Sequence, residues 1–347
     1  EIGKIVYLIQ GRVAPFFEPI ELGMAESMVA QAIGRAYGRS KDDVIKLYRQ
    51  KGNMGIAAGE LAAKVKVQKS KVKSELSVSD VFAELLEIAK FSGKGTVEQK
   101  VSTLANLLSK LDSVSVKHVA NIPQGTLRLG IGDPTIMDAL SLAKKGDKSL
   151  RKVIEAAYNK TSDLGYIAEE FFKRGEKGLE GVKLVVGKPV RPALAERLPN
   201  ADEAIKRLGP EFAAEPKFDG FRVAVHKDGD VVKLFSRNLE NTTNAFPDIV
   251  EAVKKEIKAK SLILEGEAIA YNPETEEFLP FQETTKRRRK YQIEEMAAKL
   301  PLVLFAFDVL YLNGEDITLK PYTERRKALV KIIVEEGGRV RLAEERI

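Results

Sequence analysis

A lysine that could act as a nucleophile stands at position 217, in the run Glu215-Pro216-Lys217-Phe218-Asp219-Gly220-Phe221-Arg222. A protonated lysine is a poor nucleophile, so a catalytic lysine needs burial or nearby positive charge that lowers its pKa. Arg222 lies five residues further on, within reach of the same pocket. In an extended backbone Asp219 shares a face with Lys217. Gly220 permits a tight turn or the close approach of a phosphate.

The pattern Lys-x-Asp-Gly is weak by itself, because it arises by chance in roughly one chain of this length in ten. Taken alone, a surface turn is the simpler interpretation. The absence of cysteine excludes disulfides, a thiol nucleophile and a cysteine-ligated zinc site. The two histidines, His118 and His226, are far apart in sequence and are expected to be surface or helix residues rather than metal ligands. Catalysis would then use Lys, Arg, Asp and Glu, with a divalent ion held by oxygen ligands.

Further motifs follow Lys217 in a defined order. They are residues 235–240 (FSRNLE), 264–268 (LEGEA) and 305–314 (FAFDVLYLNG). Together with the run at Lys217 they resemble the motifs of ATP-dependent DNA ligases, in particular the archaeal and eukaryotic replicative type. Upstream, residues 125–130 and 187–195 are similar to segments of that family's helical DNA-binding domain and its exit. The resemblance extends over nearly the whole chain.

The resemblance implies a reaction in three steps. Lys217 would attack the α-phosphate of ATP, form a lysine phosphoramidate and expel pyrophosphate. Arg222, Arg237 and Mg²⁺ would stabilise the phosphate charge. The adenylate would pass to the 5′-phosphate of a nick in duplex DNA, and the 3′-hydroxyl would displace it. Such an enzyme would serve DNA replication, repair and recombination.

The resemblance also assigns the remaining nucleotide contacts. Glu215 would read the amino edge of adenine, and Phe307 would stack on the base. Glu267 would hold the ribose or a metal-bound water, although Glu265 shares its strand face and the sequence leaves that role open to it. Asp219 and Glu267 are the candidate metal ligands.

Without the family, the residues around Phe307 favour a different interpretation. Phe305, Phe307 and Val309 alternate, which predicts that all three point to one face and form simple core. A ring that stacks on the base would face the nucleotide site, whereas a core ring would be enclosed among apolar side chains.

The excess of basic over acidic residues agrees with a polyanionic partner. The net charge is +7 and the sequence pI is about 9.2, although a solvated lysine-rich surface would give the same values. Residues 127–132, with Arg128 and Gly130, are expected to contact the minor groove, and phosphate contacts of this kind position an enzyme without reading sequence. The densest basic run is expected to contact DNA as well. Its candidate residues are Lys286, Arg287, Arg288 and Arg289.

The first half of the chain, to about residue 185, predicts helices. Val81, Phe82, Leu85, Leu86 and Ala89 recur at helical spacing. Thr96 with Gln99 resembles a capping box, before a helix with an apolar face at Leu104, Leu107, Leu108 and Leu111. Asp133-Pro134 predicts an N-cap followed by proline, with Ile136, Met137, Leu140 and Leu142 on the core side.

The second half predicts an α+β domain with antiparallel sheet. Residues 221–227 and 231–237 alternate around Asp228-Gly229, which indicates a hairpin. Further strands are expected at 261–271 and 302–312, and a helix at 247–258. The prolines of residues 187–195 favour a connector. We therefore expect a helical DNA-binding domain at residues 1–190 and an adenylation domain at residues 191–347.

Proteins with other functions share some of these sequence features. An RNA ligase or a capping guanylyltransferase shares the lysine motif, and a non-catalytic nucleic-acid-binding protein could use the same scaffold. No signal peptide or membrane span is found, so an intracellular, nucleoid-associated monomer is expected, with a sliding clamp as a further partner. The family's later motifs and its oligonucleotide-binding domain are not found before Ile347, and we expect a longer protein. The nucleotide donor stays open among ATP, ADP, GTP and NAD.

Overall fold

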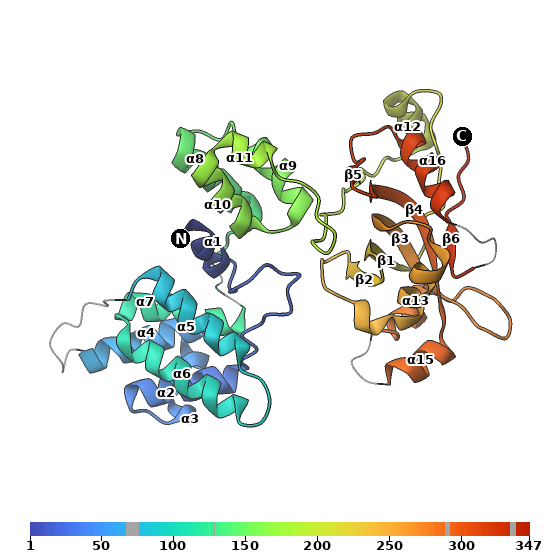
Figure 1. The fold of residues 1–347 in the computed structure, drawn as a ribbon. Helices are drawn as coiled ribbons and strands as arrows, with labels where there is room; N and C mark the ends of the chain where they lie inside the picture. The colour runs from blue at the N-terminus through green and yellow to red at the C-terminus, as the bar shows by residue number, and fades with distance from the viewer. Residues whose placement is uncertain (67–75, 126, 128, 289–291, 334–337) are drawn as a thin grey trace. The chain divides into compact units, whose positions relative to one another are not determined.

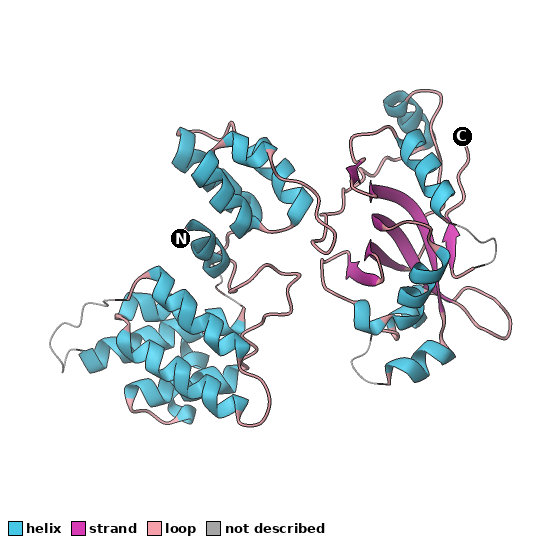
Figure 2. Cartoon of the chain, in the orientation of Figure 1, coloured by secondary structure: helices cyan, strands magenta, loops and turns pink. Residues whose placement is uncertain are grey.

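The computed structural model describes residues 1–66, 76–125, 127, 129–288, 292–333 and 338–347 (Figure 1). The chain forms two compact units. The helical unit comprises residues 1–158 and 163–181, and the sheet unit comprises residues 159–162 and 182–347. The described secondary structure of the first is helical, whereas the second is built around a sheet (Figure 2).

The helical unit agrees with the expectation of an all-α first half. Its helices are α1 (Ile2–Ile9), α2 (Glu26–Tyr37), α3 (Lys41–Lys51), α4 (Met54–Lys66), α5 (Val78–Lys90), α6 (Thr96–Lys110), α7 (Ser113–Val119), α8 (Asp133–Lys145), α9 (Arg151–Thr161), α10 (Leu164–Arg174) and α11 (Glu176–Glu180). Helices α2 to α7 surround one apolar core, in which α2 packs on α6 and α4 packs on α7. Helix α1 packs on α10.

The expected apolar faces are largely confirmed. In α5 the expected Val81, Phe82 and Leu85 are buried, and Leu86 and Ala89 are half-buried. Ser77 and Asp80 form a reciprocal capping box at its start. All four leucines of the expected stripe lie in the core, three of them in α6 and Leu111 at its C-cap, and α6 packs on α2 and α5.

Three details of the helix predictions are wrong. The N-cap of α6 is Gly95, and the hydroxyl of Thr96 donates instead to the carbonyl of Gly93. The N-cap of α8 is Gly132, so Asp133 is its first helical residue; its carboxylate accepts hydrogen bonds from Gln10 and Tyr158. Leu142 is exposed, because it lies off the buried stripe of α8. The carboxylate of Asp133 therefore makes tertiary hydrogen bonds, whereas no side chain caps the start of α8.

The sheet unit has the expected α+β composition. Its strands are β1 (Phe221–Asp228), β2 (Val231–Ser236), β3 (Ser261–Ala270), β4 (Leu302–Leu312), β5 (Glu315–Asp316) and β6 (Val340–Leu342). Its helices are α12 (Ala201–Leu208), α13 (Pro247–Glu256), α14 (Phe281–Thr285), α15 (Ile293–Lys299) and α16 (Tyr322–Ile332).

The sheet follows the order β2-β1-β3-β4-β5, and every neighbouring pair in this order is antiparallel. Strand β6 pairs in parallel with β4, which the sequence did not predict. The expected hairpin joins β1 to β2, and Gly229 takes a positive φ of 56° in its turn.

The two faces of this sheet differ in character. The core face carries Val223, Val225, Leu264, Ala268 and Ala306, among other apolar side chains, and helices α13 and α16 cover it. Because side chains alternate along a strand, the residues between these point the other way. We call this second surface the polar face, and it carries Arg222, His226, Glu265, Glu267, Phe305 and Phe307.

A bulge in β4 overturns the expected alternation of Phe305, Phe307 and Val309. Gly266 pairs with Ala306 and Glu265 with Asp308, so Phe307 has no partner on β3. One extra residue in a strand turns the side chains directly after it to the opposite face of the sheet. Val309 therefore joins Ala306 in the core, while the two phenylalanines lie on the polar face.

Candidate active site

The segment that carries Lys217 enters the sheet through a fixed glycine. The amide of Gly220 donates to Oε1 of Glu267 at 3.2 Å. A Cβ at this position would lie 2.6 Å from the carbonyl oxygen of Ala268 on β3. Glycine is therefore required for close approach to the neighbouring strand, rather than for the positive φ of a tight turn. Lys217, three residues earlier, is exposed.

Arg222 is the centre of a network on the polar face. Its Nε donates to Oε2 of Glu265 at 2.7 Å, and Glu265 is buried, with 5% of its side chain exposed. The guanidinium lies 4.6 Å from the centre of the Phe307 ring. Burial raises the pKa of Glu265, and the charge of Arg222 opposes that rise. These contacts fix the guanidinium of Arg222 between an anion and an aromatic ring.

Glu267 lies beside the Lys217 segment. It is the strand partner of Arg222 on β1 and of Phe305 on β4. Burial raises its pKa, the bond from Gly220 and the charges of Arg222 and Lys217 lower it, and the charge of Asp219 raises it. The structure thus brings Lys217, Asp219, Arg222 and Glu267 into one electrostatic neighbourhood.

Aromatic rings line the same face. Phe218 stacks on Phe305 with ring centroids 4.6 Å apart and planes at 19°, and Phe278 meets Phe305 edge-on at 5.4 Å. Phe305 and Phe307 are half-buried rather than enclosed in the core. The interpretation of Phe307 as simple core is therefore wrong.

Arg237 is exposed and follows the end of β2. It lines a small cavity together with Pro189, Arg222, Phe235 and Glu265. Two residues on, Leu239 is buried with a φ of 66°, a costly conformation for a residue with a Cβ. The amide of Leu239 donates to the carbonyl of Ser236, which fixes the tight turn that carries Arg237.

Glu215 has partners that sequence reasoning missed. Its Oε1 accepts a hydrogen bond from the hydroxyl of Tyr322 at 2.8 Å, and the same hydroxyl lies 2.6 Å from Oε2 of Glu345. The three residues are far apart in sequence. A second missed pair is Arg325 with Asp308, in which two guanidinium nitrogens contact the carboxylate at 2.8 and 3.0 Å. Asp308 lies in the motif at residues 305–314, but no local feature of the sequence indicates Arg325 as its partner.

The basic run that was expected to contact DNA divides into buried and exposed members. Arg287 is fully buried and forms two hydrogen bonds with Asp248, at 2.8 and 3.0 Å. The expectation for Arg287 is thereby corrected, because its guanidinium is enclosed between α13 and the segment before β4. Lys286 and Arg288 are exposed and pair with Glu283 and Glu240. Arg289 lies outside the described residues.

His226 also departs from expectation. It is buried on β1, where its Nδ1 accepts a hydrogen bond from the amide of Gly187 at 3.0 Å and its ring packs edge-on against Phe235. Burial lowers its pKa to about 3, with a further contribution from the charge of Lys233. His118, by contrast, lies exposed on α7, as expected of a helix residue.

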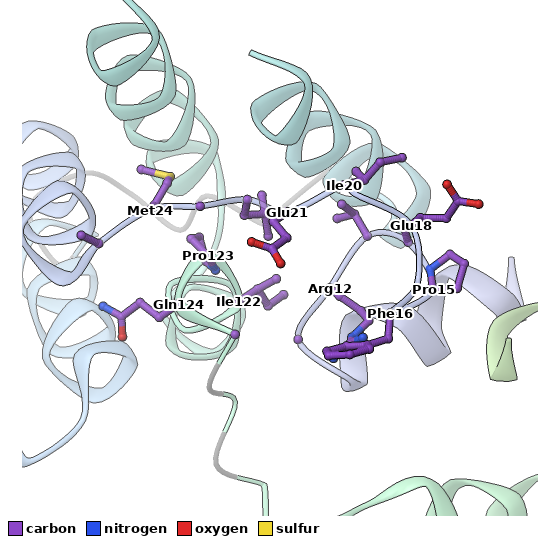
Figure 3. A pocket seen from close by; sticks show the side chains of 17 residues that line it. Arg12, Pro15, Phe16, Glu18, Ile20, Glu21, Met24, Ile122, Pro123 and Gln124 are labelled. Carbon is purple, nitrogen blue, oxygen red and sulfur yellow. The ribbon is translucent and has the colours of Figure 1, made fainter. Parts of the chain in front are cut away.

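In the helical unit, the loop before α8 holds the residues that are expected to contact DNA. Gly130 takes a φ of 69° and leaves open space around its Cα, and its neighbours Leu129 and Ile131 are both exposed. Arg128 lies outside the described residues. A cavity of about 400 Å³ lies nearby in sequence, lined by residues 11–16, 18, 20–25 and 122–125. Figure 3 shows Arg12 against the ring of Phe16 there, with the amide of Gln124 turned away from both.

Within the described residues, no group of three or more His, Cys, Asp or Glu side chains is placed to enclose a metal ion. The charge of Asp219 contributes to the raised pKa of Glu267, so the two carboxylates lie within electrostatic reach of each other. Mg²⁺ commonly binds to one or two carboxylates together with substrate phosphates and water, so this pair fits such an ion. In the same part of the chain, no helix has the length and apolar character that crossing a membrane requires.

Comparison with known proteins agrees with the resemblance seen in the sequence. Residues 192–347 match the family described as ATP dependent DNA ligase domain, and residues 1–141 match the DNA ligase N terminus. A probable DNA ligase of Dictyoglomus turgidum is 52% identical over 335 residues, which is 96% of this chain and 56% of that protein. DNA ligase 2 of Thermofilum pendens is 44% identical over 96% of this chain and 56% of its own length. The chain thus spans a little over half the length of these relatives.

Proposed function

Because the chain belongs to the ATP-dependent DNA ligase family, we propose that it forms the lysine–AMP intermediate of nick sealing in duplex DNA. Lys217 is the nucleophile. The observation that carries this proposal is the hydrogen bond from Gly220 to Glu267, which holds the Lys217 segment against the face that carries Arg222.

In the first step the unprotonated Nζ of Lys217 attacks the α-phosphorus of ATP. A P–N bond forms, the bond to the pyrophosphate oxygen breaks, and the amine proton leaves to solvent. Arg222 stabilises charge on the phosphate, since Glu265 and Phe307 already hold its guanidinium and little reorganisation is needed. Arg237, exposed beside the same small cavity, supplies a second positive charge.

The nucleoside is held by the polar face. Phe307 stacks on the base, Glu215 accepts from its amino group, and Glu267 takes the ribose hydroxyls or a metal-bound water. Asp219 and Glu267 would hold Mg²⁺, which would supply charge neutralisation at the phosphates. The remaining steps transfer AMP to the 5′-phosphate of the nick and then release it as the 3′-hydroxyl attacks.

Residues 1–190 form the DNA-binding domain and residues 191–347 the adenylation domain in this proposal. The exposed Leu129 and Ile131 around Gly130 support minor-groove contact, because apolar side chains there can press against the sugars and base edges. Lys286 and Arg288 supply phosphate contacts. The protein would act as a monomer inside the cell, in replication, repair and recombination, with a sliding clamp as a further partner.

The test is self-adenylation of this chain with α-labelled ATP and Mg²⁺. We expect an acid-labile label that Lys217→Ala abolishes and that chases onto a nicked DNA duplex. Lys254→Ala is the matched control, because Lys254 lies on α13 and pairs with Glu251. Retention of the label in Lys217→Ala would overturn the assignment, and a label that chases onto nicked RNA alone would favour an RNA ligase.

A further inference from the structure

Tyr322 occupies an unusual position between two carboxylates. It is the first residue of α16, Glu215 precedes β1, and Glu345 follows β6. The hydroxyl oxygen lies 2.8 Å from Oε1 of Glu215 and 2.6 Å from Oε2 of Glu345. Three separate segments therefore meet at one phenol. One of them carries Glu215, which lies two residues before the proposed nucleophile.

One hydroxyl proton serves two acceptors here. Burial raises the pKa of Tyr322, and the hydrogen bonds to Glu345 and Glu215 raise it further, so the hydroxyl stays protonated. Glu345 has a second partner, because Nε of Arg326 lies 3.3 Å from its Oε1. Arg326 is itself fixed by a bond to the carbonyl of Ala343. This series of side-chain contacts, from Arg326 through Glu345 to Tyr322, is therefore anchored at Arg326.

The opposite end of this series of contacts is Glu215, which Tyr322 contacts. An ionised carboxylate only accepts hydrogen bonds. Tyr322 restrains the carboxylate through one oxygen, and no further partner for Glu215 is recorded among the described residues. A restrained acceptor favours a base edge that donates, such as the 6-amino group of adenine, over the 6-oxo group of hypoxanthine or guanine.

We propose that Tyr322 is a positioning residue that holds Glu215 toward the base and so sets the preference for a 6-aminopurine nucleotide. Glu345 and Arg326 anchor the hydroxyl in turn. The inference rests on the proposed function, since it takes the Lys217 segment to bind the nucleotide. It adds the residues that give Glu215 its selectivity.

Binding of three nucleotides to this chain tests the proposal. AMP offers a donor at position 6, purine riboside monophosphate offers neither donor nor acceptor, and IMP offers an acceptor. None of them carries a pyrophosphate leaving group, so calorimetry measures binding apart from adenylation. We expect the unaltered chain to prefer AMP, then purine riboside monophosphate, then IMP. Tyr322→Phe should reduce the ratio of AMP to IMP affinity by about tenfold, as for loss of one charge-assisted hydrogen bond.

Two further variants separate this role from simple packing. Glu345→Gln keeps an amide oxygen that can accept from Tyr322, so the ratio should be retained. Glu215→Gln can turn its NH₂ toward a 6-oxo group, so IMP should gain relative to AMP. Pyrophosphate affinity should stay unchanged in Tyr322→Phe, because the phosphates lie elsewhere.

An unchanged AMP to IMP ratio in a folded Tyr322→Phe would overturn the proposal, as would equal affinity for all three nucleotides in the unaltered chain. If Tyr322→Phe does not fold, Glu215→Gln decides, and an unshifted ratio there has the same meaning. Failure of the proposed function is distinguishable. In that case the label on Lys217 would be absent while the base preference and its response to Tyr322→Phe would persist.

Discussion

The core face and the polar face of the sheet are made by the same strands and yet contain different chemistry. On β3, Leu264 and Ala268 point into an apolar layer under α13 and α16, while Glu265 and Glu267 point the other way. Burial raises the pKa of both glutamates, so the polar face keeps charges where water is scarce. One face thus contributes stability and the other contributes a preorganised electrostatic environment at some cost to stability.

The bulge at Phe307 is the point where these two roles are separated. Strict alternation would have placed Val309 on the polar face behind Phe305 and Phe307. The extra residue returns Val309 to the core and leaves the two rings opposite Glu267 and Arg222. A local irregularity of this kind is common beside functional sites.

The largest expected effect separates the two faces directly. Leu264→Ala on the core face should lower the free energy of unfolding by about 2–5 kcal/mol, because Leu264 is fully buried and its deletion leaves a cavity. Adenylation per folded molecule should change little. Chemical denaturation and the Lys217 label measure the two quantities.

Glu267→Gln is the matched change on the polar face. It should nearly abolish the label while altering the free energy of unfolding by less than about 1 kcal/mol, since the amide oxygen can still accept from Gly220. If Leu264→Ala lost the label and Glu267→Gln lost stability instead, the division between the faces would be untenable.

The Arg222–Glu265 pair should give the next largest effect. Arg222→Met leaves Glu265 buried without its cation, which should cost roughly 3 kcal/mol. We place the cost at the low end for such pairs because 31% of the Arg222 side chain is exposed. The double variant Arg222→Met with Glu265→Leu should regain most of that stability and still fail to adenylate. A double variant as unstable as Arg222→Met would mean that the pair itself stabilises the fold.

The sequence was sufficient for four strands along the chain, for the hairpin of β1 and β2, and for several residues of the polar face. Alternation and turn chemistry located β1, β2, β3 and β4 because these depend on neighbours a few residues away. The motif order drew attention to Arg222 and Glu267, and the structure brings them together. Their catalytic roles remain predictions until the variants are measured.

What the sequence could not predict depends on distant partners. Arg287 reads as one of five consecutive basic residues, yet Asp248, on another element, makes it a buried ion pair. His226 reads as a surface residue, but the amide of Gly187 satisfies its Nδ1 inside the unit. Tyr322 carries no local signal, because Glu215 and Glu345 reach it from distant segments.

The two histidines provide a smaller effect that depends on pH. The pKa of His226 is about 3 in the folded chain against 6.5 for an ordinary histidine. Between these values only the unfolded chain binds the proton, so stability falls as pH decreases, by about 1.4 kcal/mol per pH unit. His226→Asn keeps an acceptor for Gly187 and should remove this contribution.

His118→Asn is the control for that measurement, because His118 is exposed on α7. Unfolding followed at pH 5 and pH 7 should show a reduced pH dependence in His226→Asn alone. An equal pH dependence in all three proteins would show that His226 is not held neutral inside the polar face.

The smallest expected effect concerns charges that neither face buries. Lys286→Gln and Arg288→Gln should each reduce the slope of log affinity for DNA against log salt concentration by about 0.9, as for loss of one phosphate contact. Their present partners, Glu283 and Glu240, are exposed or half-buried and compete only weakly with a phosphate. Lys254→Gln should leave the slope unchanged. Arg287 cannot join this series, because it is buried and its removal would take two hydrogen bonds from the buried carboxylate of Asp248. Two neighbouring arginines therefore differ as the two faces do: Arg287 has its counter-ion inside the protein, whereas Arg288 is exposed, where a phosphate can reach it.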